Sequence, residues 1–379
     1  MMKLIKNAEL YSPEYLGKKD LLIGEEKILS IQDKIDLSFK DLEIIDAGGQ
    51  IVTPGLIDQH IHIIGAGGKQ GFYSMTPEIS PAELIRCGTT TVMGMLGTDG
   101  IAKSLKALYA KTKSLRQEGL TAYMLTSYFG LPTITLMGSV MDDMIFIDTV
   151  KGCKIAISDE RSSFPTSNDL LRLLREVYVG GAIGGKGGIL HVHLGALDTK
   201  MQILLDLVEK HQYPIKYISP THVGRTKPLF EQAIRFAKMG GMIDISTGGT
   251  KYDEPYKQVL YALDQGVPID QITFSSDGNA GMAKKDANGH IVGFYPAPID
   301  LNLEQVIKLI QLGGLSITDA FKLITINPAR NLSLAHKGSI APKNDADFCF
   351  FDSELNLTDV ISKGNIMMKN KQLVKDYSF

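Results

Sequence analysis

Two histidines separated by one residue, His60 and His62, end an apolar run that begins at Ile51. Side chains alternate between the two faces of an extended strand, so both imidazoles would point to the same side. Neutral imidazoles are common metal ligands, and two on one face can bind one ion. A His-x-His pair also occurs by chance on half-exposed strands. A metal site therefore needs further ligands elsewhere in the chain.

Further polar residues stand within or at the ends of later apolar runs. Lys154 lies inside the run 153–157, where an unpaired ammonium group is costly to bury. The aliphatic part of the Lys154 side chain could lie in the core while its ammonium group forms an ion pair or reaches the surface. Alternatively, the amine could be neutral and react with carbon dioxide to form a carbamate that bridges two metal ions. His193, His222 and Asp277 end three further runs, and a carboxylate there can bind metal and transfer protons.

Together these side chains predict a site for two metal ions. Six candidates at the ends of strand-like runs are more than chance would place there. The candidate ligands are His60, His62, Lys154, His193, His222 and Asp277. His191 lies two residues before His193, and we expect it to support a ligand rather than to bind a metal itself.

Eight apolar runs must position these ligands. They are the run ending at residue 62 and residues 90–94, 122–126, 153–157, 189–193, 218–222, 242–246 and 272–276. Helix-period segments lie between or after them, at residues 104–118, 200–211, 228–239, 254–265 and 303–312. Repeated strand–helix units occur in (β/α)₈ barrels and in doubly wound open sheets. Because the ligands follow five different strands, we expect an α/β fold with a (β/α)₈ TIM-like barrel.

The two ends of the chain have a different pattern. Residues 2–50 and those after about residue 338 hold short β-like runs separated by Gly, Pro and Asp, without a helical period. We therefore predict a small β-sandwich domain formed from both chain ends. Its two parts would be residues 1–52 and 335–379, and residues 53–334 would form the barrel.

Composition indicates a globular enzyme that acts on small molecules. The 379 residues are 44% hydrophobic and 22% charged, with a formal net charge of -2. Basic residues form no stripe, which argues against nucleic acid. We expect a cytoplasmic protein without membrane contact, because neither a signal-peptide pattern nor a membrane-spanning apolar run is evident. Cys87, Cys153 and Cys349 are far apart and are expected to be reduced. The glycine-rich run 180–188 lacks the Ser or Thr of a phosphate loop and is predicted to be a flexible loop.

The ligand pattern resembles that of the amidohydrolase superfamily of metal-dependent hydrolases. The similarity extends to residues 53–58 before the first ligands, to residues 325–329 near the end of the barrel and to residues 338–351. Local strings at residues 55–65, 96–99, 156–161, 220–225 and 275–279 resemble the isoaspartyl dipeptidases of this superfamily, which cleave amide bonds formed through an aspartate side chain.

The resemblance implies two zinc ions per chain, bridged by a carboxylated Lys154 and a hydroxide, and a homo-oligomer. Asp277 would take the hydroxide proton and pass it to the departing amine. Arg161 and Arg225 would bind the carboxylates of a small dipeptide or acyl amino acid substrate, because guanidinium forks suit carboxylates. Two further positions, Gly67 and Thr98, match residues that contact substrate.

Three positions depart from the family pattern. Lys69 stands where a glutamate pairs with the free α-amino group of the substrate, so the charge is inverted. Either Lys69 turns away, another acid such as Glu78 substitutes for the glutamate, or the substrate lacks a free amine. Phe129 aligns with a tyrosine that polarises the carbonyl, and its neighbour Tyr128 is the candidate to supply that hydroxyl. Gly281 replaces a serine near the amino end of the substrate.

We therefore expect a binuclear-metal hydrolase that cleaves the amide bond of β-aspartyl (isoaspartyl) dipeptides. A cyclic amide hydrolase or an N-acyl amino acid deacylase would use the same metal chemistry and would accommodate Lys69. A catalytically silent scaffold of the same fold is a third alternative. The complete set of ligands argues against it.

Overall fold

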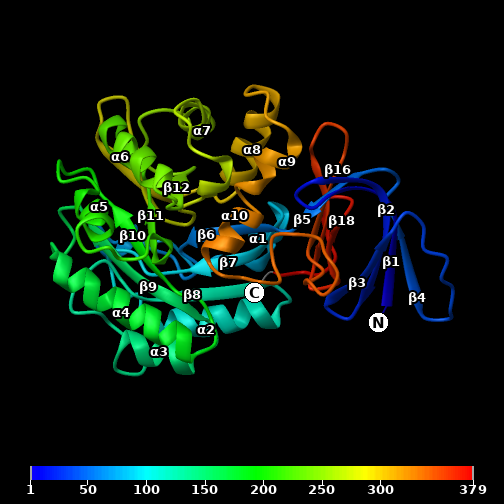
Figure 1. The fold of residues 1–379 in the computed structure, drawn as a ribbon, viewed down its shortest axis with the longest axis horizontal. Coiled ribbons are helices and arrows are strands. Elements are labelled where there is room, and N and C mark those ends of the chain that lie inside the picture. The colour runs from blue at the N-terminus through cyan, green and yellow to red at the C-terminus, as the bar shows by residue number, and fades with distance from the viewer. Residues whose placement is uncertain (1, 378–379) are drawn as a thin grey trace.

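The computed structural model describes residues 2–377, and its larger part is a barrel of eight parallel strands (Figure 1). In order around the barrel these are β6 Leu56–Ile61, β7 Thr89–Gly94, β8 Thr121–Ser127, β9 Val150–Ile157, β10 Ile189–Leu194, β11 Ile218–Thr221, β12 Ile243–Ser246 and β13 Ile272–Ser275. The barrel closes where Ile61 forms a parallel bridge with Gly278 and the amide of His62 donates to the Gly278 carbonyl at 3.0 Å. This closure confirms the predicted (β/α)₈ barrel and excludes the open sheet.

Helices surround the barrel and pack against it through their apolar residues (Figure 1). They are α1 Pro81–Arg86, α2 Leu105–Gln117, α3 Val140–Phe146, α4 Ser167–Ile183, α5 Gln202–Glu209, α6 Lys227–Lys238, α7 Pro255–Asp264, α8 Leu301–Gln311, α9 Ile317–Lys322 and α10 Ile326–Asn331. The five predicted helices correspond to α2, α5, α6, α7 and α8. Ser104 caps α2 by accepting a hydrogen bond from the amide of Ala107, which fixes where that helix begins.

The glycine-rich run 180–188 is not a loop throughout, because α4 continues to Ile183. Gly180 is buried where α4 packs on α3, and a Cβ there would lie 2.7 Å from the Cβ of Met144. The glycine therefore permits close helix packing. Only residues 184–188 form the connection to β10.

Both ends of the chain contribute to one further sheet. Its strands are β1 Met2–Tyr11, β2 Tyr15–Gly24, β3 Lys27–Gln32, β4 Leu42–Asp46, β5 Ile51–Pro54, β16 Phe348–Phe351, β17 Leu357–Ser362, β18 Asn365–Lys369 and β19 Gln372–Leu373. β5 pairs with β1 on one side and with β16 on the other, and apolar residues from both ends share one core. The small β domain formed from both ends is thus confirmed.

The apolar run before His62 divides into two strands at Gly55. β5 joins the small sheet, whereas β6 joins the barrel. Gly55 lies against Thr90 of β7, where a Cβ would come within 2.2 Å of the threonine hydroxyl. The domain limits 1–52, 53–334 and 335–379 stay predictions, and β5 crosses the first of them.

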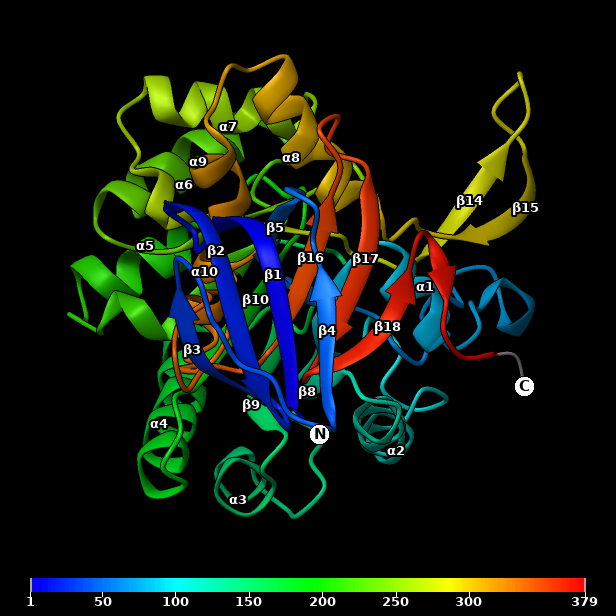
Figure 2. The same cartoon turned by 90° about the vertical axis from the view of Figure 1, so that its right-hand side faces the viewer.

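A hairpin leaves the barrel after β13. Its strands β14 Gly281–Lys285 and β15 Ile291–Pro296 project from the body of the molecule (Figure 2). On β15, the Phe294 ring contacts the Tyr73 ring of the short helix η1 Phe72–Ser74, with centroids 5.5 Å apart. The hairpin therefore lies beside the loop that follows β6. Within residues 2–377, no helix combines the length and apolar character needed to cross a bilayer.

Candidate metal centre and active site

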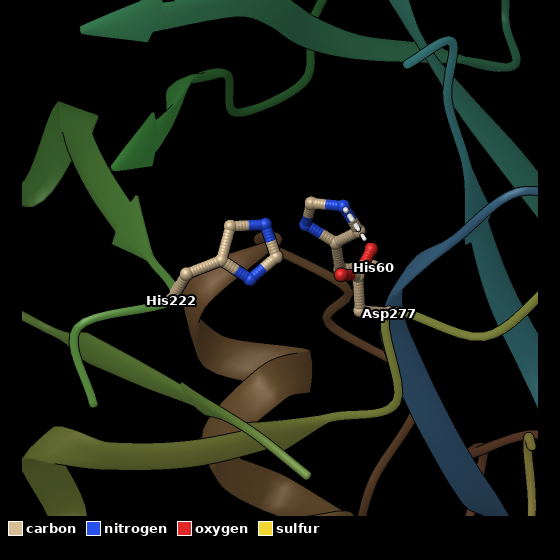
Figure 3. A group of neighbouring side chains, drawn as sticks. All are labelled: His60, His222 and Asp277. Atoms are coloured by element: carbon tan, nitrogen blue, oxygen red, sulfur yellow. Dashed lines mark ion pairs between the residues drawn. The ribbon is translucent and has the colours of Figure 1, made fainter. Parts of the chain in front are cut away.

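The predicted ligands meet at the carboxyl ends of the barrel strands. His60 lies in β6, His222 follows β11 and Asp277 follows β13, and their ligand atoms all lie within 4.8 Å of one another (Figure 3). Asp277 Oδ1 lies 3.5 Å from Nε2 of His60 and 3.3 Å from Nε2 of His62. One carboxylate oxygen thus faces both His60 of β6 and His62, which directly follows it.

Lys154 lies inside β9 and is wholly buried. Its Nζ is 3.3 Å from Nε2 of His60 and 3.2 Å from the sulfur of Met95. In the described part of the chain, no carboxylate forms an ion pair with this amine. Burial lowers the pKa of Lys154 to about 7, because the ammonium form loses its hydration. A substantial neutral fraction, the form that reacts with carbon dioxide, is therefore present near neutral pH.

His193 completes the group from β10. Its ring centroid lies 4.5 Å from that of His222, and its Nε2 is 3.1 Å from Oδ2 of Asp159. Burial lowers the pKa of His193 to about 3, so the ring is neutral. The structure gathers all six residues, with His60, His222 and Asp277 in one tight set and His62, Lys154 and His193 around it.

The donor set fits divalent metal ions. Nε2 of His222 is buried and has no hydrogen-bond partner among residues 2–377, while its Nδ1 lies 2.5 Å from the Ser246 hydroxyl. A buried polar atom without a partner is costly, and a bound cation would satisfy it. Burial also lowers the pKa of His60 and of His222 well below the ordinary value, so both are neutral and competent to bind metal. His222 and Asp277 have φ angles of 62° and 50°, a rare conformation that concentrates at functional sites.

Behind His60, a buried hydrogen-bonded chain fixes the ring. Nδ1 of His60 is hydrogen-bonded to Nε2 of His191 at 2.9 Å, and Nδ1 of His191 to the Ser219 hydroxyl at 3.1 Å. The side-chain amide of Asn331 donates to Ser219 and to Gln59 at 2.9 Å each. His191 thus lies where a supporting residue would act.

A pocket opens over the metal-ligand group, and its wall includes His62, His193 and Asp277. The predicted substrate residues that line it are Gly67, Lys69, Thr98, Arg161 and Arg225, and Gly281, one of the departures from the family pattern, lines it as well. Gly97 lies beside His62, where a Cβ would be 3.4 Å from the imidazole, an ordinary van der Waals distance. The pocket therefore joins the metal ligands to the residues predicted to hold substrate.

The two arginines of the pocket differ in their partners. Arg161 is held by Asp159 through Nε at 2.7 Å and Nη2 at 2.5 Å, and its Nη1 lies 3.4 Å from the Thr98 hydroxyl. By contrast, Nε of Arg225 is buried without a hydrogen-bond partner in the described chain. Arg225 is the cation more available to a substrate carboxylate.

A model of the amidohydrolase family matches residues 51–367. The chain belongs to the amidohydrolase family. Among solved structures, the β-aspartyl dipeptidase from Fervidobacterium islandicum AW-1 in complex with β-Asp-Leu is 41% identical to it. Both chains are covered completely, with a TM-score of 0.92.

Curated relatives of the chain include enzymes named for other reactions, among them an adenine deaminase and a dihydroorotase. An adenine deaminase of Clostridium perfringens is 24% identical over 400 residues, which cover 99% of this chain and 60% of the deaminase. A dihydroorotase of Staphylococcus epidermidis is 36% identical over 97 residues, or 26% of this chain and 22% of the dihydroorotase. The chain thus spans less than two thirds of the length of these relatives.

In this amidohydrolase, Tyr128 is not among the residues that line the pocket, and its role in polarising the carbonyl stays a prediction. β8 ends at Ser127, whose φ of 69° turns the chain. Phe129 then forms the pocket wall, with its ring centroid 4.2 Å from that of His193. The Tyr128 ring packs beside Gly100 instead.

Glu78, the acid suggested as a substitute for the family's glutamate, contacts another side chain. Its carboxylate pairs with Lys111 of α2 at 3.2 Å and is absent from the pocket wall. Lys69, however, does line the pocket and does not turn away. Lys69 therefore places a positive charge at the position where the family pattern has a negative one.

Sequence reasoning missed Asp159. It stands two residues after the end of β9, as Asp277 stands two residues after the end of β13, so the same signal identifies both. Three residues that line the pocket, Gly249, Thr250 and Met282, carry no comparable signal because they lie in loops or at the start of the hairpin.

Proposed function

We propose that the chain is a metal-dependent hydrolase that cleaves the amide bond of β-aspartyl dipeptides. The observation that carries this proposal is one pocket in which metal ligands and two arginines face the same space. The 41% identity over the full length of a β-aspartyl dipeptidase bound to β-Asp-Leu supports the same substrate class.

Two zinc ions would be held by His60, His62, His193, His222, Asp277 and a carboxylated Lys154. Such a pair of ions supplies a nucleophilic hydroxide at neutral pH and polarises the scissile carbonyl. The carbamate would give two oxygen ligands at a place where the protein otherwise offers only nitrogen and sulfur. This accounts for a lysine buried without an acidic partner.

The protein's own groups would bind substrate and move the proton. Arg225 and Arg161 would orient the two carboxylates of the dipeptide by charge-assisted hydrogen bonds. A carboxylate oxygen of Asp277 would accept the proton of the attacking water and deliver it to the nitrogen of the departing amino acid. Phe129 would shield this space from water, since its ring covers one face of His193.

The test is hydrolysis by enzyme loaded with two equivalents of Zn²⁺. We expect cleavage of β-linked aspartyl-leucine compounds, with kcat/KM at least about 100-fold higher than for α-Asp-Leu, because only the β-linked isomer places both carboxylates and the scissile bond correctly. An Arg225→Met variant should lose most of this activity through KM. Cleavage of cyclic amides in preference to every β-linked compound would contradict the proposal.

The cytoplasmic location expected from the sequence pattern and the homo-oligomeric state implied by the resemblance are part of the same proposal. Metal analysis should give about two divalent ions per chain. Light scattering after size-exclusion chromatography would measure the mass of the assembly.

A further inference from the structure

The pocket holds more positive charge than a dipeptide with a free amine would need. Lys69, Arg161 and Arg225 all line it, whereas Asp277 is the one acid among its described lining residues. Within residues 2–377, neither Lys69 nor Arg225 takes part in an ion pair. Partial burial and the nearby guanidinium groups lower the pKa of Lys69, so the three cations act on one another.

The acids nearest this space are already engaged. Asp159 is held by Arg161. Asp99 accepts three backbone amides of its own loop, at 2.8 to 3.2 Å. Asp277 belongs to the metal-ligand group. A substrate ammonium group would thus meet three cations and no free carboxylate, which is unfavourable.

A second cavity adjoins the pocket at Lys69. The two cavities share Gly67, Lys69 and Thr98, and the second is otherwise lined largely by glycines and the apolar side chains of Phe72, Met75, Ile101 and Ala102. Phe72 and Ile101 are each 83% exposed. Large apolar side chains this exposed beside a binding site have surface left to bury against a ligand.

We propose that the preferred substrates are β-aspartyl amides whose α-amino group carries an acyl chain. Lys69 donates to the acyl oxygen, and the chain lies against Phe72 and Ile101. Acylation removes the ammonium charge and adds an acceptor oxygen, while both carboxylates remain for the guanidinium groups. The reaction consumes one water and breaks the β-amide bond, giving an N-acyl aspartate and the free amino acid. This inference rests on the proposed function and specifies its substrate class.

The experiment compares β-Asp-Leu with its N-acetyl, N-butanoyl and N-hexanoyl derivatives, using the Zn²⁺-loaded enzyme. We expect kcat/KM to be at least about tenfold higher for the acylated compounds. It should rise with chain length by up to about fourfold per methylene group that becomes buried. The products distinguish cleavage of the β-amide bond from loss of the acyl group.

Substitutions in the pocket and in the second cavity distinguish the effect of the Lys69 charge from the effect of apolar contact with the acyl chain. Lys69→Glu should reverse the preference toward free β-Asp-Leu, and Lys69→Met should reduce the preference without reversing it. Ile101→Ser should flatten the dependence on chain length and leave the charge preference intact. Lys285→Met removes an exposed lysine of the hairpin outside the pocket and should change neither.

Calorimetric binding gives a readout that does not depend on turnover. N-hexanoyl-L-aspartate should bind the zinc enzyme at least about tenfold more tightly than L-aspartate, and Lys69→Met should remove most of that difference. If β-Asp-Leu is cleaved as well as its acyl derivatives and the two ligands bind equally, the inference is wrong while the proposed function stands. If N-hexanoyl-L-aspartate binds tightly but no β-linked compound is cleaved, the proposed function fails, and the assigned substrate class fails with it.

Discussion

His60 contacts the metal-ligand group with one ring nitrogen and the protein interior with the other. Its Nε2 faces Asp277, whereas its Nδ1 is hydrogen-bonded to His191, which in turn contacts Ser219. A ring held from behind keeps one tautomer and one orientation. Burial lowers the pKa of His191 well below its ordinary value, so this support is neutral and does not repel a cation.

We predict that His191 positions His60 without binding metal itself. His191→Leu should weaken metal affinity or lower kcat by about 10- to 100-fold, and His191→Gln, whose amide oxygen can still accept from Nδ1–H of the ring, should lose less. Competition with a chromogenic chelator measures the affinity. His336→Asn, a change at an exposed histidine, is the matched control. Equal metal affinity in all four proteins would contradict the positioning role.

At the residue scale, sequence patterns predict the direction of side chains that end strands, but not of those that follow a turn. All six metal-ligand candidates lie in strands or within two residues of their ends, where period-two alternation fixes direction. The choice between Tyr128 and Phe129 depends instead on the positive φ of Ser127. Serine gives no signal for that conformation, since it adopts it rarely.

At the scale of elements, Lys337 joins the returning C-terminal segment to the barrel. It is buried, and its Nζ lies 2.6 Å from the Thr121 hydroxyl of β8 and 2.9 Å from Asp345. It also pairs with Asp347, which stands just before β16. These contacts attach the last strands of the small sheet to the start of β8.

We predict that Lys337→Met lowers the free energy of unfolding by about 3–5 kcal/mol, because it leaves the buried carboxylate of Asp347 without its cation. Urea unfolding measures the change. Lys210→Met breaks only the exposed pair with Asp206 and should cost no more than about 1 kcal/mol. Equal losses in the two variants would show that the buried cluster does not secure the domain.

The same cluster predicts a pH dependence. Burial disfavours the charged forms of both Lys337 and Asp345. The charge of Lys337 nevertheless lowers the pKa of Asp345, and the charges of Asp347 and Asp345 raise the pKa of Lys337. Because the pKa of Asp345 is lower in the folded state, this group stabilises the fold above about pH 3.9. The stabilisation is lost as the pH falls through the pKa that Asp345 has in the folded protein. Because the pKa of Lys337 is higher in the folded state, this group stabilises the fold below about pH 10.4. The stabilisation is lost as the pH rises through the pKa that Lys337 has in the folded protein. The stability difference between wild type and Lys337→Met should therefore be flat from pH 5 to 9 and shrink on the acid side.

Most strands and five helices could be predicted because each carries a clear apolar period. The division at Gly55 could not, since the run from Ile51 to His62 is continuous in sequence. What divides it is the contact of Gly55 with Thr90, 35 residues later. Gly180 was misassigned for the same reason, because the neighbour that makes glycine necessary there lies on another helix.

For the whole molecule, we predict that metal removal destabilises the barrel. Ions that bind only the folded state stabilise it by RT ln(1 + [L]/Kd), about 2.7 kcal/mol per site at 100 times Kd. Chelation should therefore lower Tm by several degrees, and Zn²⁺ should restore it, as followed by scanning fluorimetry. In Lys154→Ala the response to Zn²⁺ should be much smaller. An unchanged Tm in the wild type would argue against an integral metal centre.

The contacts that close the barrel join residues next to the first metal-ligand candidates to residues next to the last one. The amide of His62 bonds to Gly278, and the side chain of Asn279 donates to the His62 carbonyl at 2.9 Å, across 217 residues of sequence. Contacts of such separation form late and slow folding. During synthesis, the first two ligands leave the ribosome long before Asp277, so the emerging chain carries histidines that cannot yet form the centre. Hydrolytic competence should arise in one step, when the last barrel strand meets the first.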